Sequence, residues 1–166
     1  MSDLIDRLAR LTCLRDVDAL DVALCGLARD VLACQQVSIH RLVGDHRGRS
    51  WLTTACAGRG PDSLLPALDK PLPGVDERPH WRDAALGGQP LHCPGSLHST
   101  LHSMSDDTDA LAVLAVHSDD PPGPESLRLT ASLLGFYRQL RGLMHENERD
   151  SLTGLLNRKT FDEAFV

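Results

Sequence analysis

The sequence predicts an α+β domain in which helices flank an antiparallel sheet. Two amphipathic segments, 3–11 and 17–34, precede the first strand-like run. Two pairs of strand-like runs follow, and a polar turn joins the members of each pair, which is typical of β-hairpins. A long amphipathic segment, 125–149, ends the pattern. Helix, hairpin, irregular segment, hairpin and long helix together favour an antiparallel sheet with helices packed beside it.

The first two segments have the periodicity of helices. Apolar residues recur at positions 4, 8 and 11 of the first segment. In the second, apolar residues are three or four positions apart, which places them in one stripe along about five turns. These residues are Val17, Leu20, Leu24, Leu27, Val31 and Cys34. Asp16 precedes them as a candidate N-cap, and we expect this helix to pack on the sheet.

Four runs have the pattern of strands. In 36–43 the residues Val37, Ile39, Arg41 and Val43 alternate onto one face, and 50–57 follows after a glycine-containing turn. The runs 96–104 and 110–117 form a second predicted hairpin. Because its residues 110–116 are almost continuously apolar, we expect a central strand that is covered on both faces.

Between the hairpins the regular pattern is lost. Seven of the ten prolines lie in 58–95, which disfavours regular strands. We expect short helices at 63–68 and 81–86. A long irregular segment in a compact domain often forms a binding loop, so we expect 58–95 to wall a small-molecule pocket above the sheet. The candidate pocket residues are Trp51, Arg78, His80, Trp81, Arg82, Cys93 and His98.

Cysteine and histidine chemistry gives weaker indications. The five cysteines are widely spaced and odd in number, which fits buried free thiols better than a disulfide framework. His92, Cys93, His98 and His102 carry metal-ligating groups. On a strand, His98 and His102 would lie about 13 Å apart, too far for one ion, whereas on a helix they would be one turn apart and could chelate one. A thiol-dependent enzyme would use Cys56 with Cys93.

Composition limits the partners of the chain. Its 166 residues suffice for one domain with appendages, and its net charge is −6. Since no run of Lys or Arg is present, we expect no duplex nucleic acid and no anionic membrane as partner. Nor is there an apolar stretch of the length that a signal peptide or membrane span needs. We therefore expect a cytoplasmic protein.

The segment 125–149 carries two apolar stripes. One has the alternating spacing of four and three residues that a coiled-coil seam uses, and it predicts a parallel homodimer. Its residues are Leu129, Leu133, Phe136, Leu140, Leu143 and Asn147. The other stripe suits packing on the same domain. It consists of Leu127, Thr130, Leu134, Tyr137 and Met144. The alternative to a dimer is a helix that docks only on its own domain.

Residues 150–166 resemble the start of the GGDEF domain of bacterial diguanylate cyclases. The pattern Asp-x-Leu-Thr-Gly-Leu-x-Asn-Arg is matched from Asp150 to Arg158, and Phe161 follows at helical spacing. In such a cyclase, which makes cyclic di-GMP from two GTP, the resemblance implies that Asp150 binds Mg²⁺ and Asn157 contacts guanine. Val166 stands where the family often has a second, acidic guanine contact. The family's glycine-rich acidic hairpin is absent, so we expect no catalysis and no cofactor in these 166 residues.

The element order over 16–148 is similar to a GAF domain, a sensor fold often placed ahead of GGDEF modules. A PAS domain is the nearest rival, but the long helix before the first strand favours GAF. The resemblance implies an N-terminal helix (1–15), a sensor core (16–124), a signalling helix (125–149) and the start of a GGDEF domain (150–166). The expected function is a sensory or dimerising input domain of a diguanylate cyclase. A ligand-free dimerisation module and a thiol-dependent enzyme are the alternatives.

Overall fold

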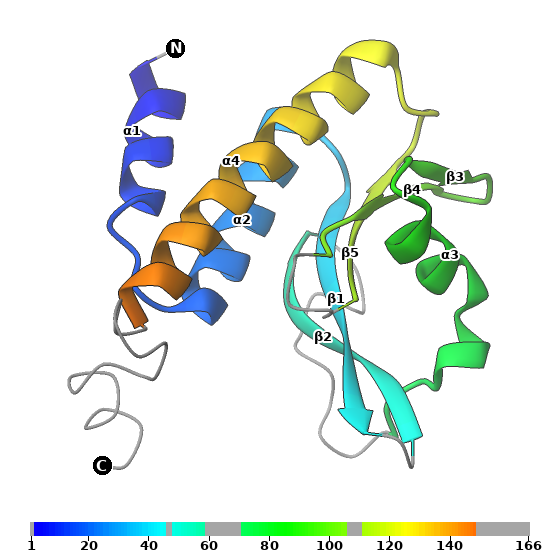
Figure 1. The fold of residues 1–166 in the computed structure, drawn as a ribbon. Coiled ribbons are helices and arrows are strands. Elements are labelled where there is room, and N and C mark those ends of the chain that lie inside the picture. Colours follow the sequence, from blue (N-terminus) through cyan, green and yellow to red (C-terminus); the bar gives the residue numbers. More distant parts are fainter. Residues whose placement is uncertain (1, 46–47, 59–70, 106–110, 149–166) are drawn as a thin grey trace.

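The computed structural model describes residues 2–45, 48–58, 71–105 and 111–148 (Figure 1). In these ranges five strands form one antiparallel sheet with the order β2-β1-β5-β4-β3. The elements along the chain are α1 (Ser2–Leu11), α2 (Val17–Leu32), β1 (Gln36–Asp45), β2 (Gly48–Gly58), the 3-10 helix η1 (Val75–Glu77), α3 (Pro79–Gly87), β3 (Leu91–Cys93), β4 (His98–Ser103), β5 (Ala112–Ser118) and α4 (Pro124–Glu148). The predicted α+β class is confirmed.

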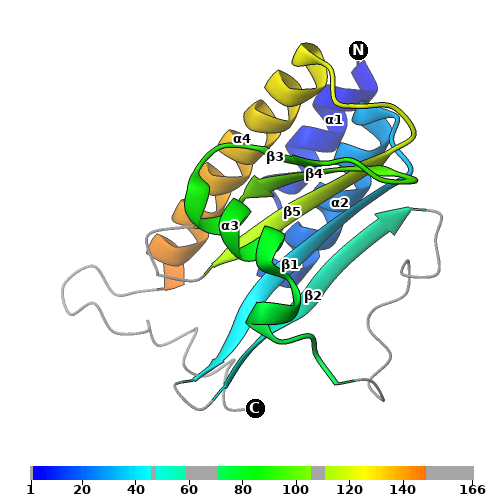
Figure 2. The ribbon, with the colours of Figure 1, turned by 90° about the vertical axis from the view of Figure 1, so that its right-hand side faces the viewer.

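The sheet separates two layers of helices. Helices α1, α2 and α4 lie on one face, and α3 with η1 lies on the other (Figures 1 and 2). Each side has its own apolar core: a large one beneath α2 and α4, and a smaller one beneath α3. Nowhere in the described ranges is a helix both long and apolar enough to cross a membrane.

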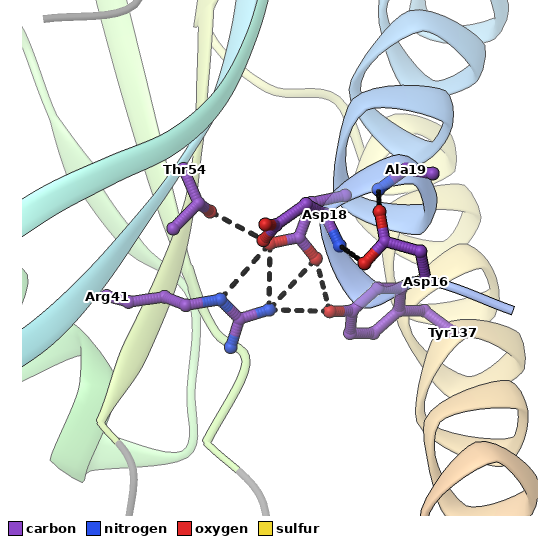
Figure 3. Close-up of polar contacts among 7 residues, drawn as sticks. Asp16, Asp18, Ala19, Arg41, Thr54 and Tyr137 are labelled. Carbon is purple, nitrogen blue, oxygen red and sulfur yellow. Dashed lines mark hydrogen bonds and ion pairs between the residues drawn. The ribbon is translucent and has the colours of Figure 1, made fainter. Parts of the chain in front are cut away.

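Helix α2 forms where the sequence predicts it. The Asp16 carboxylate accepts hydrogen bonds from the backbone N–H groups of Asp18 and Ala19 at 3.3 and 3.2 Å, so it caps the helix as expected (Figure 3). The predicted stripe is buried at Leu20, Leu24 and Leu27. These contacts place α2 against the sheet.

Both predicted hairpins are present. Strand β5 lies in the middle of the sheet, and its residues Ala112–Val116 are all buried, as expected for a strand covered on both faces. The β1–β2 ladder changes register between Ile39 and His40, which marks a β-bulge.

The proline-rich segment contains more order than the sequence suggests. The helix expected at 81–86 is α3, whereas the one expected at 63–68 lies outside the described residues. Strand β3 was not expected, and it pairs as an edge strand with β4. Its three residues lie between Pro90 and Pro94, so neither proline occupies a position in the ladder.

Helix α4 packs on its own domain through residues of both predicted stripes. Leu133 and Leu140 are buried in the large core together with Leu134, Tyr137 and Met144. A dimer seam therefore cannot include Leu133 and Leu140 without opening that core. The buried face is centred between the two stripes, because residues three and four apart share one side of a helix.

The remaining seam residues lie to one side of that buried face. Leu129 and Phe136 are half-buried, Leu143 is exposed, and the side chain of Asn147 is outside the described part. Since Leu129, Phe136 and Leu143 are seven residues apart, they form one line along α4. The homodimer stays a prediction, and this line is the surface left for it.

Candidate functional site

Four side chains form a stacked cluster on the α3 side of the sheet, here called the α3-face cluster: His40, Trp51, Arg78 and Trp81. The Trp81 ring lies nearly parallel to the His40 ring, with centroids 3.8 Å apart and planes 17° apart. Trp51 meets Trp81 edge to face at 5.7 Å. The guanidinium carbon of Arg78 lies 5.2 Å from the Trp81 ring centroid, within the range of a cation–π contact.

Local sequence explains how the cluster is assembled. Residues of a strand alternate between faces, so His40 points to the α3 side while its neighbours Ile39 and Arg41 point to the α2 side. Pro79 suits the first turn of α3, where its missing N–H is not needed. Ala84 and Ala85 are buried under α3, and their small side chains let the helix lie close to the sheet. Trp81 is thereby held over β1.

His40 is a buried and uncharged platform. Its Nε2 lies 2.9 Å from Ser38 Oγ, and its Nδ1 lies 2.9 Å from Thr53 Oγ1. Burial lowers the His40 pKa to about 3, and the positive charges of His117 and Arg78 add to the effect. The ring is therefore neutral at physiological pH and offers one donor and one acceptor nitrogen.

This pKa predicts an acid-sensitive fold. Between about pH 6.5 and 3 the unfolded chain binds a proton at His40 that the folded chain does not. The contribution of His40 to the free energy of unfolding is fully present above pH 6.5 and decreases as the pH falls toward 3. Urea unfolding should show that the free energy of unfolding decreases less between pH 7 and pH 5 in His40→Gln than in the parent. The exposed His80→Gln is the matched control, and a loss in His40→Gln as large as in His80→Gln would contradict the assignment.

Trp51 supplies an unused hydrogen-bond donor. Its side chain is 1% exposed, and its Nε1–H has no acceptor among the described residues. Leaving such a donor unpaired costs about 1–3 kcal/mol. A molecule that brings an acceptor to this indole would recover that energy, which makes the α3-face cluster the candidate ligand site.

The structure brings some of the predicted pocket residues together and leaves others apart. Trp51, Arg78 and Trp81 are in the cluster, and Cys93 packs against the same small core. His80 is exposed on α3.

Two further candidates have other partners. Arg82 points outward and pairs with Asp76 at 3.5 Å and Asp83 at 3.6 Å. His98 stacks on His92, with Nδ1 and Nε2 3.1 Å apart, at the β3–β4 edge. Neither Arg82 nor His98 is part of the cluster.

Sequence reasoning missed the polar side of the site. Ser38, His40 and Thr53 form a hydrogen-bonded row on the α3 face, and His117 Nδ1 lies 2.8 Å from Ser99 Oγ on the same face. A signal was available, because Ser38 and His40 alternate with the apolar residues of β1. Polar residues at inward positions of a strand indicate a site when both faces of the sheet are covered.

The other face of the sheet holds a buried ion pair that the sequence also did not indicate. Asp21 of α2 is fully buried, and Arg41 of β1 donates to it from Nε and Nη2 at 3.1 and 2.9 Å. Thr54 of β2 donates to the same carboxylate at 2.8 Å. The Tyr137 hydroxyl of α4 donates to Asp21 and accepts from Arg41 Nη2 at 2.7 Å. Figure 3 shows Arg41, Thr54 and Tyr137 converging between the sheet and the helices.

This Asp21 network, consisting of Asp21, Arg41, Thr54 and Tyr137, joins four elements at one point. Burial raises the Tyr137 pKa to about 12, and the charge of Asp21 adds to the effect. The hydroxyl is therefore protonated and can donate at physiological pH. Because every polar atom named here is paired, the network holds α4 in one position relative to β1 and β2.

The thiol pairing considered for an enzyme is wrong. Cys56 is on β2 and Cys93 is on β3, the two opposite edges of the sheet. Four strand spacings separate them by roughly 19 Å, far beyond the reach of a disulfide. Within the ranges that the structure describes, no three His, Cys, Asp or Glu side chains are grouped so as to hold a metal ion.

No protein-family model and no curated protein sequence matches the chain. Three solved structures illustrate its likeness in fold. Residues 122 to 287 of a methyl-accepting chemotaxis protein superpose with a TM-score of 0.66 at 15% identity, covering 84% of this chain and 97% of that one. The GAF domain/HD domain protein from Geobacter sulfurreducens gives 0.61 at 17% identity, with 82% and 97% covered. The phycoerythrobilin-bound GAF domain from a cyanobacterial phytochrome gives 0.60 at 13% identity, with 86% and 96% covered.

These likenesses each cover 82% or more of this chain rather than one motif. At identities of 13–17% they support the fold, and the function has to be argued from the residues of the site. The antiparallel sheet, the flanking helices and the long final helix α4 agree with the element order expected from the sequence. The chain therefore has the α+β fold of a GAF domain.

Proposed function

We propose that this chain is a ligand-responsive regulatory domain that controls a diguanylate cyclase. The observation that carries the proposal is the α3-face cluster, in which a buried indole N–H lacks an acceptor next to a neutral imidazole and a second indole. GAF domains are sensory domains of signalling proteins, and the phytochrome domain of this fold is bound to phycoerythrobilin.

The cluster favours a planar ligand with a hydrogen-bond acceptor and a negative charge. Trp81 covers His40 but is itself partly exposed, and a planar molecule would stack on the part of the Trp81 ring that His40 leaves open. Trp51 Nε1–H would donate to the acceptor. Arg78 is exposed and cationic beside the same rings, so it would pair with an anionic group at the entrance.

Helix α4 would transmit the conformational change to the domain that follows it. This helix runs to Glu148, directly before the GGDEF-like motif at Asp150. In the proposed cyclase, Asp150 binds Mg²⁺, Asn157 contacts GTP, and two copies of the domain meet as a homodimer. The 166-residue chain itself is proposed to have no catalytic activity.

A ligand-free dimerisation module is the second candidate. It is favoured by the close packing of the α3-face cluster, since Trp81 already covers His40 at a stacking distance. In that case the cluster would be structural, and only α4 would act, as a dimerisation surface.

A binding titration separates the two candidates. The chain has two tryptophans, and both are in the cluster, so intrinsic fluorescence reports directly on the site. Phycoerythrobilin and a purine cyclic nucleotide are suitable planar, anionic probes. We expect quenching that saturates for at least one, and a loss of affinity of 10-fold or more in Trp81→Ala. The solvent-facing Leu86→Ala on the same helix is the control.

If neither probe nor a wider set of planar anions changes the fluorescence or the melting temperature, the dimerisation module is the better account. If a ligand binds equally well to Trp81→Ala and to the parent, the domain is a sensor but the cluster is not its site.

A nucleotide assay tests the proposal that the 166-residue chain has no cyclase activity. Because the acidic hairpin of the cyclase is absent from the sequence, we expect no cyclic dinucleotide when the 166-residue chain is incubated with GTP and Mg²⁺. Product detection by chromatography is the measurement, with an active cyclase as positive control. Formation of cyclic di-GMP by the purified chain would refute this part of the proposal.

A further inference from the structure

The two faces of the sheet are connected residue by residue at the β-bulge. His40 and Arg41 are consecutive on β1, and Thr53 and Thr54 are consecutive on β2. On the α3 face, His40 Nδ1 lies 2.9 Å from the Thr53 hydroxyl. On the opposite face, Arg41 and Thr54 both donate to Asp21. On each strand, therefore, one residue faces α3 and the next belongs to the Asp21 network. His40 and Arg41 are these two residues on β1, and Thr53 and Thr54 are these two residues on β2.

We propose that this bulge couples the α3-face cluster to α4, so that a change at His40 or Trp81 alters how the Asp21 network holds Tyr137. The inference rests on the proposed function, because it assigns the route by which that site is regulated. It concerns the residues of the chain alone, however, and it is testable without a ligand.

The geometry gives a physical reason for coupling. Since His40 and Arg41 share a peptide bond, a rotation of β1 that displaces one side chain moves the other in the opposite direction. Bulges interrupt the ladder and increase local twist, and so they are points where a strand can turn without losing its whole pairing. Ile39 pairs with Ala55 and His40 pairs with Thr53, so Thr54 is the extra residue and the bulge is on β2, opposite the step from Ile39 to His40.

The Asp21 network is suited to a discrete response. Arg41 has 16% of its side chain exposed and Asp21 has none, so a small separation would leave a buried charge without its partner. Such a group exchanges one paired arrangement for another rather than deforming gradually. Tyr137 belongs to α4, and any new arrangement of Arg41 therefore acts on the helix that leads to residue 150.

Each face carries its own spectroscopic reporter. The chain has one tyrosine, Tyr137, and two tryptophans, Trp51 and Trp81. The indole N–H signals report on the α3 face, and a ¹³Cζ label in tyrosine reports on the Asp21 network. A change on one face can thus be followed on the other.

The first test replaces Tyr137 with Phe, which removes only the hydroxyl. In ¹H–¹⁵N spectra of the full chain we expect both indole signals to move by more than their line widths, although Tyr137 lies across the sheet. Thr130→Val is the matched control, because Thr130 is also buried on α4 but its hydroxyl bonds to Ser126 O of the same helix at 2.8 Å. Unmoved indole signals in Tyr137→Phe, or equal shifts in both variants, would overturn the coupling.

The reciprocal test replaces Trp81 with Ala and observes the ¹³Cζ signal of Tyr137. We expect a shift that Leu91→Ala, which trims the same small core away from His40, does not produce. An unchanged tyrosine signal in Trp81→Ala would also overturn the coupling. Neither NMR test depends on ligand binding. These tests can therefore refute the coupling without refuting the sensor function, and the ligand titration can refute the sensor function without refuting the coupling.

Discussion

Replacing Asp21 with Asn is expected to lower the free energy of unfolding by about 3–5 kcal/mol, because it leaves Arg41 charged and unpaired beneath α2. The carboxylate is fully buried and accepts from Arg41, Thr54 and Tyr137. Urea unfolding followed by circular dichroism should show a lower midpoint with an unchanged m-value. An effect of this size is rare among single substitutions and would identify the network as the polar centre of the fold.

Two variants control this experiment. Asp18→Asn is on the same helix but exposed, and it should cost less than about 1 kcal/mol. Asp21→Leu combined with Arg41→Met removes both charges, and the pair should recover much of the lost stability. If Asp21→Asn is no more destabilising than Asp18→Asn, the network does not hold α4 to the sheet.

Leu140→Lys and Leu143→Lys should have opposite consequences despite lying three residues apart. Leu140 is 8% exposed in the core of the single chain, whereas Leu143 is 57% exposed. Leu140→Lys loses apolar burial, which alone is worth about 2–5 kcal/mol, and places an ammonium group in the core. We therefore expect this variant to be unfolded or strongly destabilised at any concentration. Leu143→Lys should keep the stability of the monomer within about 0.5 kcal/mol.

The same pair tests the homodimer. If Leu129, Phe136 and Leu143 form the contact line, Leu143→Lys places like charges opposite each other in a parallel pair. Association should weaken by two or more decades, about 2.7 kcal/mol or more. Sedimentation equilibrium of the parent and of Leu143→Lys is the measurement. Equal association of the two would place the dimer contact elsewhere or remove it.

Local patterns were sufficient to predict most of the elements. The Asp16 cap, the apolar stripe of α2 and the continuous apolar run of β5 each reflect short-range rules, and each appears in the structure. Strand β3 was not predicted because three residues are too few to show a periodicity and prolines lie on both sides of them. Its pairing depends on β4, which is a tertiary contact and not a property of the segment.

The site was harder to predict because it depends on pairs of distant residues. Trp51 and Trp81 were expected near a pocket, but His40, on which Trp81 stacks, was not. Asp21 lies one position from the apolar stripe of α2, and its burial becomes intelligible only with Arg41 and Tyr137 in place. On α4 the heptad spacing was real, yet both stripes were needed to cover one domain, so Leu133 and Leu140 belong to the core.

The proposed sensor function depends on the α3-face cluster receiving a ligand, and the indole N–H of Trp51 tests this most directly. A ¹H–¹⁵N titration of the chain with phycoerythrobilin, a purine cyclic nucleotide and related planar anions follows that single donor. If the cluster is the ligand site, a binding ligand shifts the Trp51 indole signal downfield as the N–H gains an acceptor, and Trp81→Ala abolishes the shift. A ligand that binds and stabilises the chain while both indole signals stay in place would contradict it.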